Sequence, residues 1–287
     1  MGSQTPAAAA GSITIGGDLK VNRLGYGAMR LTGPGVWGPP ADRDEAVRVL
    51  RRAVELGVNF IDTADSYGPY VSEEIIREAL HPYRELVIAT KAGLLRTGPD
   101  KWIPLSNPPY LRQEVEMSLR RLDIERIDLF QLHRVDRQIP LEDQLGELVA
   151  LHDEGKIRHI GLSEVSVGML DAAQQITPIV SVQNQYNLTY RKADPLVDAA
   201  ADRGVAFIPW FPLASGPLAG PDGPLAQIAA RHDATAAQLA LAWLLKRSPA
   251  MLPIPGTSRV AHLEENVAAA EITLSDAEFA ELSALGG

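Results

Sequence analysis

Short apolar runs alternate with amphipathic segments along most of this chain. Each run has the length of one buried strand, and the segments between the runs place apolar residues at helical spacing. Regular alternation of strand and helix predicts parallel βαβ units. We expect eight strands, at residues 26–29, 58–61, 86–90, 127–132, 157–162, 179–183, 205–210 and 251–254.

Capping and stop signals frame the expected helices. Asp42, Ser72 and Ser275 each precede an amphipathic segment and can cap its amino end. Gly57 and Gly155 follow two of the segments and can end them. We expect helices at residues 43–56, 73–80, 111–122, 141–154, 167–175, 194–203, 225–232, 236–246, 262–270 and 276–285.

Eight strand–helix units close a (β/α)8 barrel, a fold of typically about 250 residues. The chain has 287 residues and no linker divides it, so we predict a single α/β domain, a (β/α)8 TIM barrel, over residues 13–287. Residues 13–24 are typical of a short N-terminal β-hairpin with Gly16 and Gly17 at its turn. A doubly wound sheet is the alternative, but no GxGxxG follows the first strand, so a Rossmann dinucleotide site has no support.

Composition limits the location and partners of the protein. Residues 1–12 are small and polar and lack the basic region and apolar core of a signal peptide, so we expect a disordered N-terminal lead. No apolar run approaches the roughly 18 residues of a membrane helix. The chain has no Cys, which is compatible with the cytosol, and its formal net charge of -9 argues against non-specific nucleic-acid binding. We predict a cytoplasmic protein without nucleic-acid or membrane partners, and nothing in the sequence sets its oligomeric state.

Four ionisable residues fall at the ends of neighbouring expected strands. Asp62, Lys91 and His133 end the second, third and fourth strands, and Tyr67 follows in the loop after the second. In a barrel these strand ends meet at one rim, where such folds carry their chemistry. Asp62 could instead cap a turn, and a single His is more often structural. Lys91 is harder to explain in that way, because a buried ammonium needs a partner, and Asp62 is the obvious one.

These residues lie in motifs that resemble the aldo-keto reductase family over nearly the whole chain from Ile13. The nearest subgroup is that of the bacterial soluble reductases with an IPGTS signature. The resemblance implies reduction of small-molecule aldehydes or ketones to alcohols with a nicotinamide cofactor and without a metal. The matching stretches are LGYGAMR (24–30), FIDTADSYG (60–68), IATKAG (88–93), DLFQLHRVD (128–136), IRHIGLSE (157–164), VQNQYN (182–187), FIPWFPL (207–213) and IPGTSRVAHLEEN (254–266).

The resemblance also assigns catalytic roles. Tyr67 would be the general acid, and a free phenol with a pKa near 10 is a reluctant donor at neutral pH. The Lys91 ammonium would favour the phenolate and so ease proton donation. Asp62 would hold Lys91, and His133 would hydrogen-bond and polarise the substrate carbonyl.

The cofactor would lie extended across the same rim. Trp210 matches the family's aromatic residue that stacks on the nicotinamide, and Ser163, Glu164 and Gln183 match the positions that bind its carboxamide. Residues 211–218 match the loop over the pyrophosphate, and later residues match the adenosine end. The matching cofactor positions are Ala28, Met29, Asp62, Ser163, Glu164, Gln183, Trp210, Phe211, Pro212, Leu213, Ser215, Leu218, Ile254, Gly256, Thr257, Ser258, Arg259, His262, Glu265 and Asn266.

Three positions bear on how the cofactor binds. Arg259, with a helix start behind it, could take a 2′-phosphate, so we expect NADPH to be preferred over NADH. Gly256 stands where mammalian-type members have a phosphate-binding Lys, which weakens that preference. Glu164 stands where the family usually has Asn, and an ionised Glu offers only acceptors to a carboxamide.

The substrate pocket and two rival functions complete the prediction. The pocket would have aromatic walls suited to apolar or aromatic carbonyl compounds, with the loop at 92–109 and the C-terminal tail deciding the substrate. One rival is a regulatory subunit that binds the nicotinamide cofactor with little turnover. Another is a Schiff-base aldolase with Lys91 as nucleophile, which contact with Asp62 disfavours because the carboxylate stabilises the charged amine. The predicted pocket residues are Met29, Trp37, Tyr67, Trp102 and His133.

Overall fold

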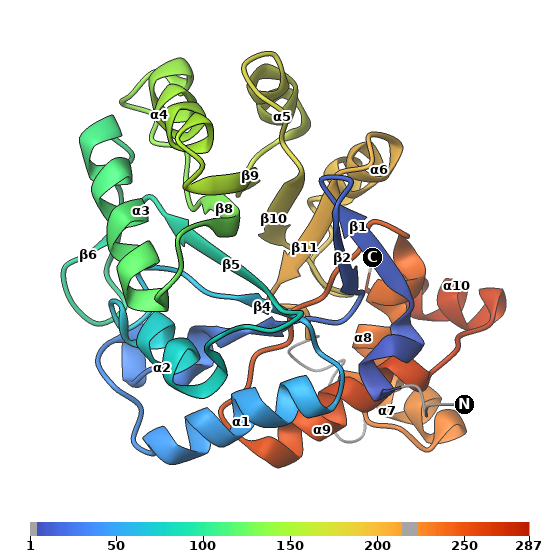
Figure 1. Ribbon diagram of the computed structural model, residues 1–287. Coiled ribbons are helices and arrows are strands. Elements are labelled where there is room, and N and C mark those ends of the chain that lie inside the picture. The colour runs from blue at the N-terminus through green and yellow to red at the C-terminus, as the bar shows by residue number, and fades with distance from the viewer. Residues whose placement is uncertain (1–4, 214–222, 287) are drawn as a thin grey trace.

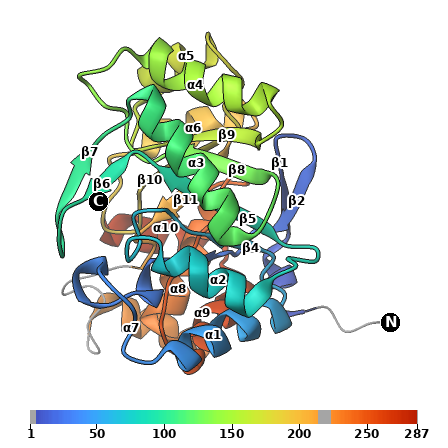
Figure 2. The ribbon, with the colours of Figure 1, turned by 60° about the vertical axis from the view of Figure 1, so that its left-hand side comes forward.

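A ring of parallel strands surrounded by helices makes up the molecule (Figure 1, Figure 2). The computed structural model describes residues 5–213 and 223–286. Seven parallel strands form one sheet in the order β11-β10-β9-β8-β5-β4-β3, so the predicted barrel architecture is confirmed. The strands are β3 (Tyr26–Gly27), β4 (Phe60–Asp62), β5 (Val87–Ala92), β8 (Ile127–Leu132), β9 (Ile157–Ser163), β10 (Ser181–Gln185) and β11 (Ala206–Trp210).

The predicted eighth strand, at residues 251–254, is wrong as a strand, although the segment occupies its place in the ring. The N–H and C=O of Phe207 in β11 each form a 2.9 Å hydrogen bond with this part of the chain. On the other side, the N–H of Gly25 donates to the carbonyl of Pro253 at 2.9 Å. Pro253 and Pro255 have no N–H and cannot extend a ladder. The segment therefore joins β11 to the region of β3 without a regular strand.

The expected helices are present with shifts of a few residues at their ends. Asp42 and Ser275 cap helices α1 and α10 as predicted, each accepting the N–H three residues later. The helix after residue 224 ends as a short 3₁₀ turn, and so does the one after Val260. The helices are α1 (Arg43–Glu55), α2 (Val71–Leu80), α3 (Pro108–Leu122), α4 (Leu141–Asp153), α5 (Val167–Gln174), α6 (Asp194–Asp202), α7 (Pro224–Ala229), α8 (Ala236–Arg247), α9 (Val260–Ala268) and α10 (Asp276–Leu285).

Helix α2 begins earlier than predicted, and Ser72 is not its cap. Tyr70 precedes the first helical residue with a φ of 72°, in the left-handed region. Ser72 is fully buried, and its hydroxyl donates to the carbonyl of Ala28 at 3.3 Å and bonds to the Thr63 hydroxyl at 2.8 Å. Ser72 therefore ties α2 to the site loops instead of capping the helix.

The N-terminal hairpin closes the amino end of the barrel. Strands β1 (Ser12–Ile15) and β2 (Leu19–Asn22) pair antiparallel, which confirms the predicted hairpin. Ile15, Leu19 and Val21 are buried and belong to one apolar cluster with residues of the barrel strands, Phe60, Val87, Ala89, Leu129, Ala206 and Ile208 among them. At the turn, Asp18 binds His159 of β9 at 2.6 Å. The hairpin thus leaves open the opposite end of the strands, where the predicted catalytic residues lie.

The prediction of a disordered lead is wrong for residues 5–12. Pro6–Ala10 forms a 3₁₀ helix, with Pro6 at its first position. Ala7 is fully buried in the cluster that covers α1, and its N–H donates to the carbonyl of Leu56 at 3.0 Å. The methyl group of Ala7 packs against the barrel helices. The composition of this segment, rich in small residues, did not predict that contact. Residues 1–4 lie outside the described part of the chain.

The predicted loop at 92–109 contains a small hairpin. Strands β6 (Leu94–Arg96) and β7 (Trp102–Pro104) pair antiparallel, and Figure 2 shows them projecting at one edge of the barrel. The hairpin places Trp102 over the catalytic rim, 6.5 Å from Tyr67 between ring centroids. Within the two described ranges, no helix combines the length and apolarity needed to cross a membrane.

Candidate active site

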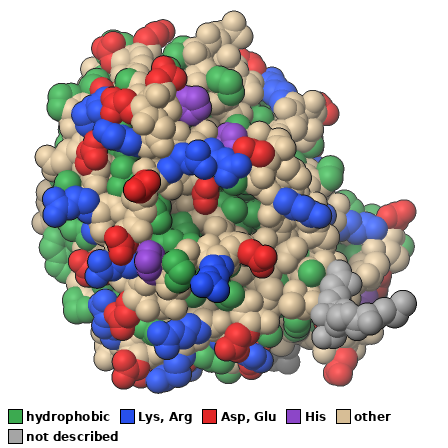
Figure 3. All heavy atoms as spheres, viewed as in Figure 1, with side chains coloured by type: hydrophobic (Ala, Val, Ile, Leu, Met, Phe, Trp, Pro, Cys, Tyr) green, Lys and Arg blue, Asp and Glu red, His purple; other side chains and the backbone are tan. Residues whose placement is uncertain are grey.

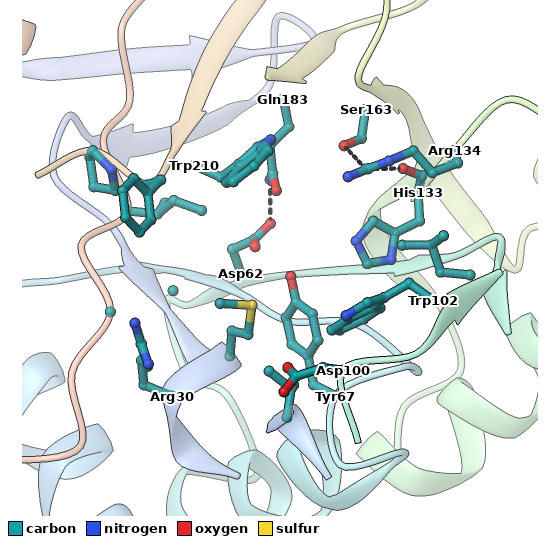
Figure 4. A pocket seen from close by; sticks show the side chains of 18 of the residues that line it. Arg30, Asp62, Tyr67, Asp100, Trp102, His133, Arg134, Ser163, Gln183 and Trp210 are labelled. Carbon is teal, nitrogen blue, oxygen red and sulfur yellow. Dashed lines mark hydrogen bonds between the residues drawn. The ribbon is translucent and has the colours of Figure 1, made fainter. Parts of the chain in front are cut away.

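The four predicted catalytic residues meet at the carboxyl ends of three adjacent strands. Asp62 is the last residue of β4, Lys91 lies near the end of β5, and His133 directly follows β8. The N–H of His133 donates to the carbonyl of Ala92 at 2.8 Å, which keeps this turn in register with β5. Tyr67 comes from the loop between β4 and α2 and points up between Asp62 and His133 (Figure 4). The sheet order brings Asp62, Lys91 and His133 together, and the loop after β4 adds Tyr67.

Lys91 is the centre of the polar network. Its fully buried Nζ donates to Asp62 Oδ1 at 2.6 Å, to the Thr63 carbonyl at 2.7 Å and to the Tyr67 hydroxyl at 3.4 Å. Burial acts to lower the pKa of Lys91, but the Asp62 carboxylate and Tyr67 together outweigh it and raise that pKa above its usual value. Lys91 is therefore an ammonium at physiological pH.

Tyr67 differs from expectation in its ionisation. Burial is the largest effect and raises the pKa of the phenol above 10, while the Lys91 ammonium opposes it. The predicted effect of Lys91 on the phenol is present, but the effect of burial on the pKa is larger, and Asp62 nearby also disfavours the phenolate. Tyr67 is consequently protonated across the physiological range, as a proton donor must be.

Two glutamines hold the second oxygen of Asp62. Gln131 Nε2 donates to Asp62 Oδ2 at 3.1 Å, and Gln183 Nε2 donates to the same atom at 2.8 Å. Gln131 was not predicted, although a single amide within the apolar run DLFQL was a detectable signal. With Lys91 on the other oxygen, both sides of the Asp62 carboxylate are bonded, which fixes its orientation.

His133 is buried and neutral. Burial, followed by the positive charges of Lys91, Arg134 and Arg96, lowers its pKa well below the usual value of 6.5. Its Nδ1 lies 3.3 Å from the Ser66 hydroxyl. When Ser66 donates to Nδ1, the hydrogen sits on Nε2, the nitrogen that can then serve as a donor to a ligand.

Asp62, Tyr67 and His133 line a cavity of about 710 Å³. Of the predicted substrate-pocket residues, Met29, Tyr67, Trp102 and His133 line it. Trp37 does not; it is 37% exposed and lies against the outer side of Arg96, 5.7 Å from the guanidinium carbon. The predicted cofactor positions in the cavity wall are Met29, Asp62, Ser163, Gln183, Trp210, Phe211, Pro212, Leu213, Ile254 and Gly256.

The remaining predicted cofactor positions lie beside this cavity or further along the chain. Ser258, Arg259 and His262 are exposed on the surface, and Thr257 and Asn266 are buried. Ser215 and Leu218 fall outside the described residues. All of these stay predictions. The described positions absent from the cavity wall are Ala28, Glu164, Thr257, Ser258, Arg259, His262, Glu265 and Asn266.

Glu164 contacts the aromatic wall. Its Oε1 accepts the indole N–H of Trp210 at 2.6 Å and the backbone N–H of Gln185 at 2.8 Å. The backbone of Glu164 has a φ of 57°, a left-handed conformation that is unusual for Glu and frequent for Asn. Phe211, next to Trp210, has the same φ of 57°. Strained positions of this kind cluster at functional sites, and here they set the direction of the Trp210 ring.

The expected phosphate end of the site has a competing acid. Arg259 is the N-cap residue of α9, and its own N–H donates to the Thr257 hydroxyl at 3.2 Å. The first helical N–H, that of Val260, donates to the Glu45 carboxylate of α1 at 3.1 Å. The sequence analysis assigned a phosphate to this helix start. Glu45 already accepts one of the N–H groups that such a phosphate would use.

Arginines around the cavity were missed by sequence reasoning. Arg96 lies 3.6 Å from the centre of the Trp102 ring and donates to five backbone carbonyls, those of Gly35, Val36, Ser66, Gly98 and Lys101. Arg30 and Arg134 line the cavity directly. The His-Arg pair in DLFQLHRVD was a visible signal for Arg134, whereas carbonyl partners leave no trace in a sequence.

Comparison with known proteins places this geometry in a family. The model of the aldo/keto reductase family matches residues 23–286. The chain belongs to the aldo/keto reductase family. An uncharacterized oxidoreductase of Schizosaccharomyces pombe is 54% identical over 284 residues, covering 99% of this chain and 92% of the relative. As a family member, the protein is an oxidoreductase.

Two further relatives of this reductase family are informative. Pyridoxine 4-dehydrogenase of Escherichia coli is 46% identical over 277 residues, covering 94% of this chain and 96% of the relative. The crystal structure of an aldo-keto reductase from Klebsiella pneumoniae in complex with NADPH is 26% identical, with a TM-score of 0.82, and covers 96% of this chain and 94% of that one. The barrel is therefore that of the family.

Proposed function

We propose that this family member reduces aldehydes or ketones to alcohols with NADPH, and that Tyr67 donates the proton. The observation that carries the proposal is the chain of contacts at the cavity floor. Lys91 Nζ lies 3.4 Å from the Tyr67 hydroxyl and is itself held at 2.6 Å by Asp62. A phenol, an ammonium and a fixed carboxylate in this order suit general acid catalysis at a carbonyl oxygen.

The cavity wall fits a nicotinamide cofactor. Trp210 and Phe211 offer aromatic surface for a planar ring. The Ser163 hydroxyl accepts a bond from Arg134 and keeps its own hydrogen to donate, and the Gln183 amide nitrogen is used by Asp62, which leaves its oxygen to accept. One donor and one acceptor match a carboxamide. When bound, the reduced nicotinamide supplies a hydride.

The chain's own residues handle the carbonyl and the proton. His133, neutral and with Nε2 able to donate, would hydrogen-bond the substrate oxygen and stabilise the negative charge that develops there. Tyr67 would release its proton to that oxygen, and the Lys91 ammonium would stabilise the phenolate left behind. The preference for NADPH over NADH is supported by the NADPH complex of the Klebsiella pneumoniae relative and by the exposed Arg259.

NADPH oxidation followed at 340 nm with a panel of aldehydes and ketones tests this function. Pyridoxine with NADP⁺ belongs in the reverse assay, because a relative is named for its oxidation. We expect Tyr67→Phe to lower kcat about 10²–10⁴-fold, typical for loss of a general acid, while the Kd for NADPH stays nearly unchanged. The ring remains and only the proton is removed.

Each rival function has its own outcome in this assay. Tight NADPH binding without turnover of any carbonyl would favour the regulatory subunit. Trapping of a Lys91 imine by borohydride would favour the aldolase, which the raised pKa of Lys91 disfavours. Near-parental turnover by Tyr67→Phe would contradict the assignment of Tyr67.

A further inference from the structure

Arg134 has unused hydrogen-bonding capacity inside the cavity. Its Nη1 donates to the His133 carbonyl at 2.6 Å and to the Ser163 hydroxyl at 3.1 Å (Figure 4). Its Nε and Nη2 donate to no residue in the described ranges. In those ranges, the side-chain nitrogen and oxygen atoms that are both buried and without a partner belong to Asp65, Asn107 and Glu114. Nε and Nη2 of Arg134 are not among them, so these two nitrogens are accessible. Arg134 lines the cavity, so its free edge is within reach of a ligand.

The free edge is the one that arginine uses for carboxylates. Arg158 of the same chain binds the Asp18 carboxylate through Nε at 3.0 Å and Nη2 at 2.6 Å. Arg96, in contrast, uses Nε, Nη1 and Nη2 on backbone carbonyls and has no free nitrogen. Nε and Nη2 form a planar fork that matches both oxygens of a carboxylate. Among the described residues, Arg134 combines this open fork with a place beside His133.

Arg134 also forms no ion pair within the described part of the chain. Lys91 is paired with Asp62 at 2.6 Å, whereas no ion pair in residues 5–213 or 223–286 includes Arg134. Glu164, whose charge acts on Arg134, uses one carboxylate oxygen for the Trp210 indole and the Gln185 backbone. The outer face in Figure 3 mixes acidic and basic side chains, and the whole chain carries a formal charge of -9. A cation that forms no ion pair in the described part of an acidic protein points to an anionic ligand.

We propose that the cavity selects carbonyl substrates that carry a carboxylate, and that Arg134 binds this group through its Nε–Nη2 edge. The inference rests on the proposed reductase function and adds the substrate class to it. Aromatic side chains from Trp102 and Tyr67 line the same cavity, so an aromatic aldehyde with a carboxylate fits the site. Arg134 thus determines specificity, while the proton comes from Tyr67.

A matched pair of aldehydes tests the proposal by turnover. 4-Formylbenzoate and 4-formylbenzamide have nearly the same shape and differ by one charge. We expect the parent to have a kcat/KM about tenfold or more higher for the acid, because a charge-assisted hydrogen bond is worth about that factor or more. Arg134→Met should make the kcat/KM values of acid and amide equal, and this ratio is the readout, because loss of the bond from Arg134 to the Ser163 hydroxyl affects both substrates alike. Arg134→Lys, which keeps the charge but loses the fork, should retain part of it.

Calorimetric binding of the same two compounds separates the two proposals. If neither aldehyde is reduced, but Arg134→Met weakens binding of the acid about tenfold or more and not of the amide, the reductase proposal fails and the anion site stands. Equal kcat/KM values for acid and amide in the parent would overturn the anion site. So would equal losses for both compounds in Arg134→Met. A raised Kd for NADPH with an unchanged acid-to-amide ratio would also overturn it and make Arg134 a cofactor contact.

Discussion

At the scale of single residues, Glu164 shows how one side chain can serve the site from outside the cavity. The sequence placed it at the nicotinamide carboxamide, but in the structure its carboxylate bonds the Trp210 indole at 2.6 Å. Ser163 and Gln183 retain the donor and acceptor that a carboxamide needs. Glu164 therefore orients the Trp210 indole, and its negative charge lies near the place proposed for the nicotinamide ring.

Replacing Glu164 separates its charge from its hydrogen bonds. Gln at this position keeps an oxygen for the Trp210 indole and removes the charge that favours an oxidised, positive ring. We expect Glu164→Gln to tighten NADPH relative to NADP⁺ by about fivefold, or roughly 1 kcal/mol. Glu164→Ala should weaken both forms, because it also releases the indole. Quenching of protein fluorescence gives the two dissociation constants, and an unchanged ratio in the Gln variant would show that only the hydrogen bonds matter.

At the scale of elements, a buried acidic cluster joins the site loop to helices α2 and α3. Asp65, Glu73 and Glu114 are all nearly fully buried, and Arg121 is the cation that pairs with the last two. Burial and the neighbouring Glu114 and Glu73 raise the pKa of Asp65 well above its usual value of 3.8. One Asp65 oxygen has no hydrogen-bond partner. The folded chain therefore holds this proton more tightly than the unfolded chain does.

Asp65→Asn should stabilise the fold in a pH-dependent way. Because the pKa of Asp65 is raised in the folded state, its stabilising contribution is complete below pH 3.8 and is lost as the pH rises through the folded-state pKa. An uncharged amide avoids that loss, so we expect a gain of about 1–3 kcal/mol in the free energy of unfolding at pH 8 and little change at acidic pH. Urea unfolding at pH 8 and at pH 4 measures both values, and an equal difference at the two pH values would argue against the charge as the cause.

Elements also show what the sequence could and could not predict. Asp62, Lys91 and His133 lie at the ends of apolar runs, and this pattern predicted correctly that their side chains meet at the carboxyl ends of neighbouring strands. The β6–β7 hairpin was missed because each of its strands is only three residues long and β7 is half-buried or exposed along its length. It is held instead by Arg96 and its backbone carbonyl partners, whose positions depend on how distant loops come together.

At the scale of the whole molecule, the barrel has two ends with different tasks. The carboxyl end holds the ionisable groups, and the amino end is sealed by the β1–β2 hairpin through Ile15 and Val21. Gly16 and Gly17 at the turn predicted the hairpin, but not where it docks, because a turn signal does not specify which residues the strands pack against. This separation implies that stability at the sealed end can change without any effect on the site.

Ile15→Ala tests that separation. Ile15 is fully buried under the barrel, and large-to-small core substitutions of this kind cost about 2–5 kcal/mol of stability. We expect that loss in chemical unfolding, together with an unchanged Kd for NADPH and unchanged kcat under native conditions. Lys20→Ala, an exposed position in the same hairpin, is the matched control and should change neither quantity. A Kd that rises with Ile15→Ala would mean that the two ends are coupled.

The place of the missing eighth strand has a consequence for how the ring opens. Between β11 and β3 the described backbone offers hydrogen bonds at Phe207 and Gly25 to the segment around Pro253, in contrast to the continuous ladders of the other strand pairs. Local opening takes the route with the fewest bonds to break, so amide hydrogens along this seam should be the first of the barrel to exchange with solvent. Ile254 and Gly256, which line the cavity, continue directly from the seam. A ligand that contacts these two residues and Gly27 would hold both sides of the seam together, so ligand binding would stabilise the closed barrel.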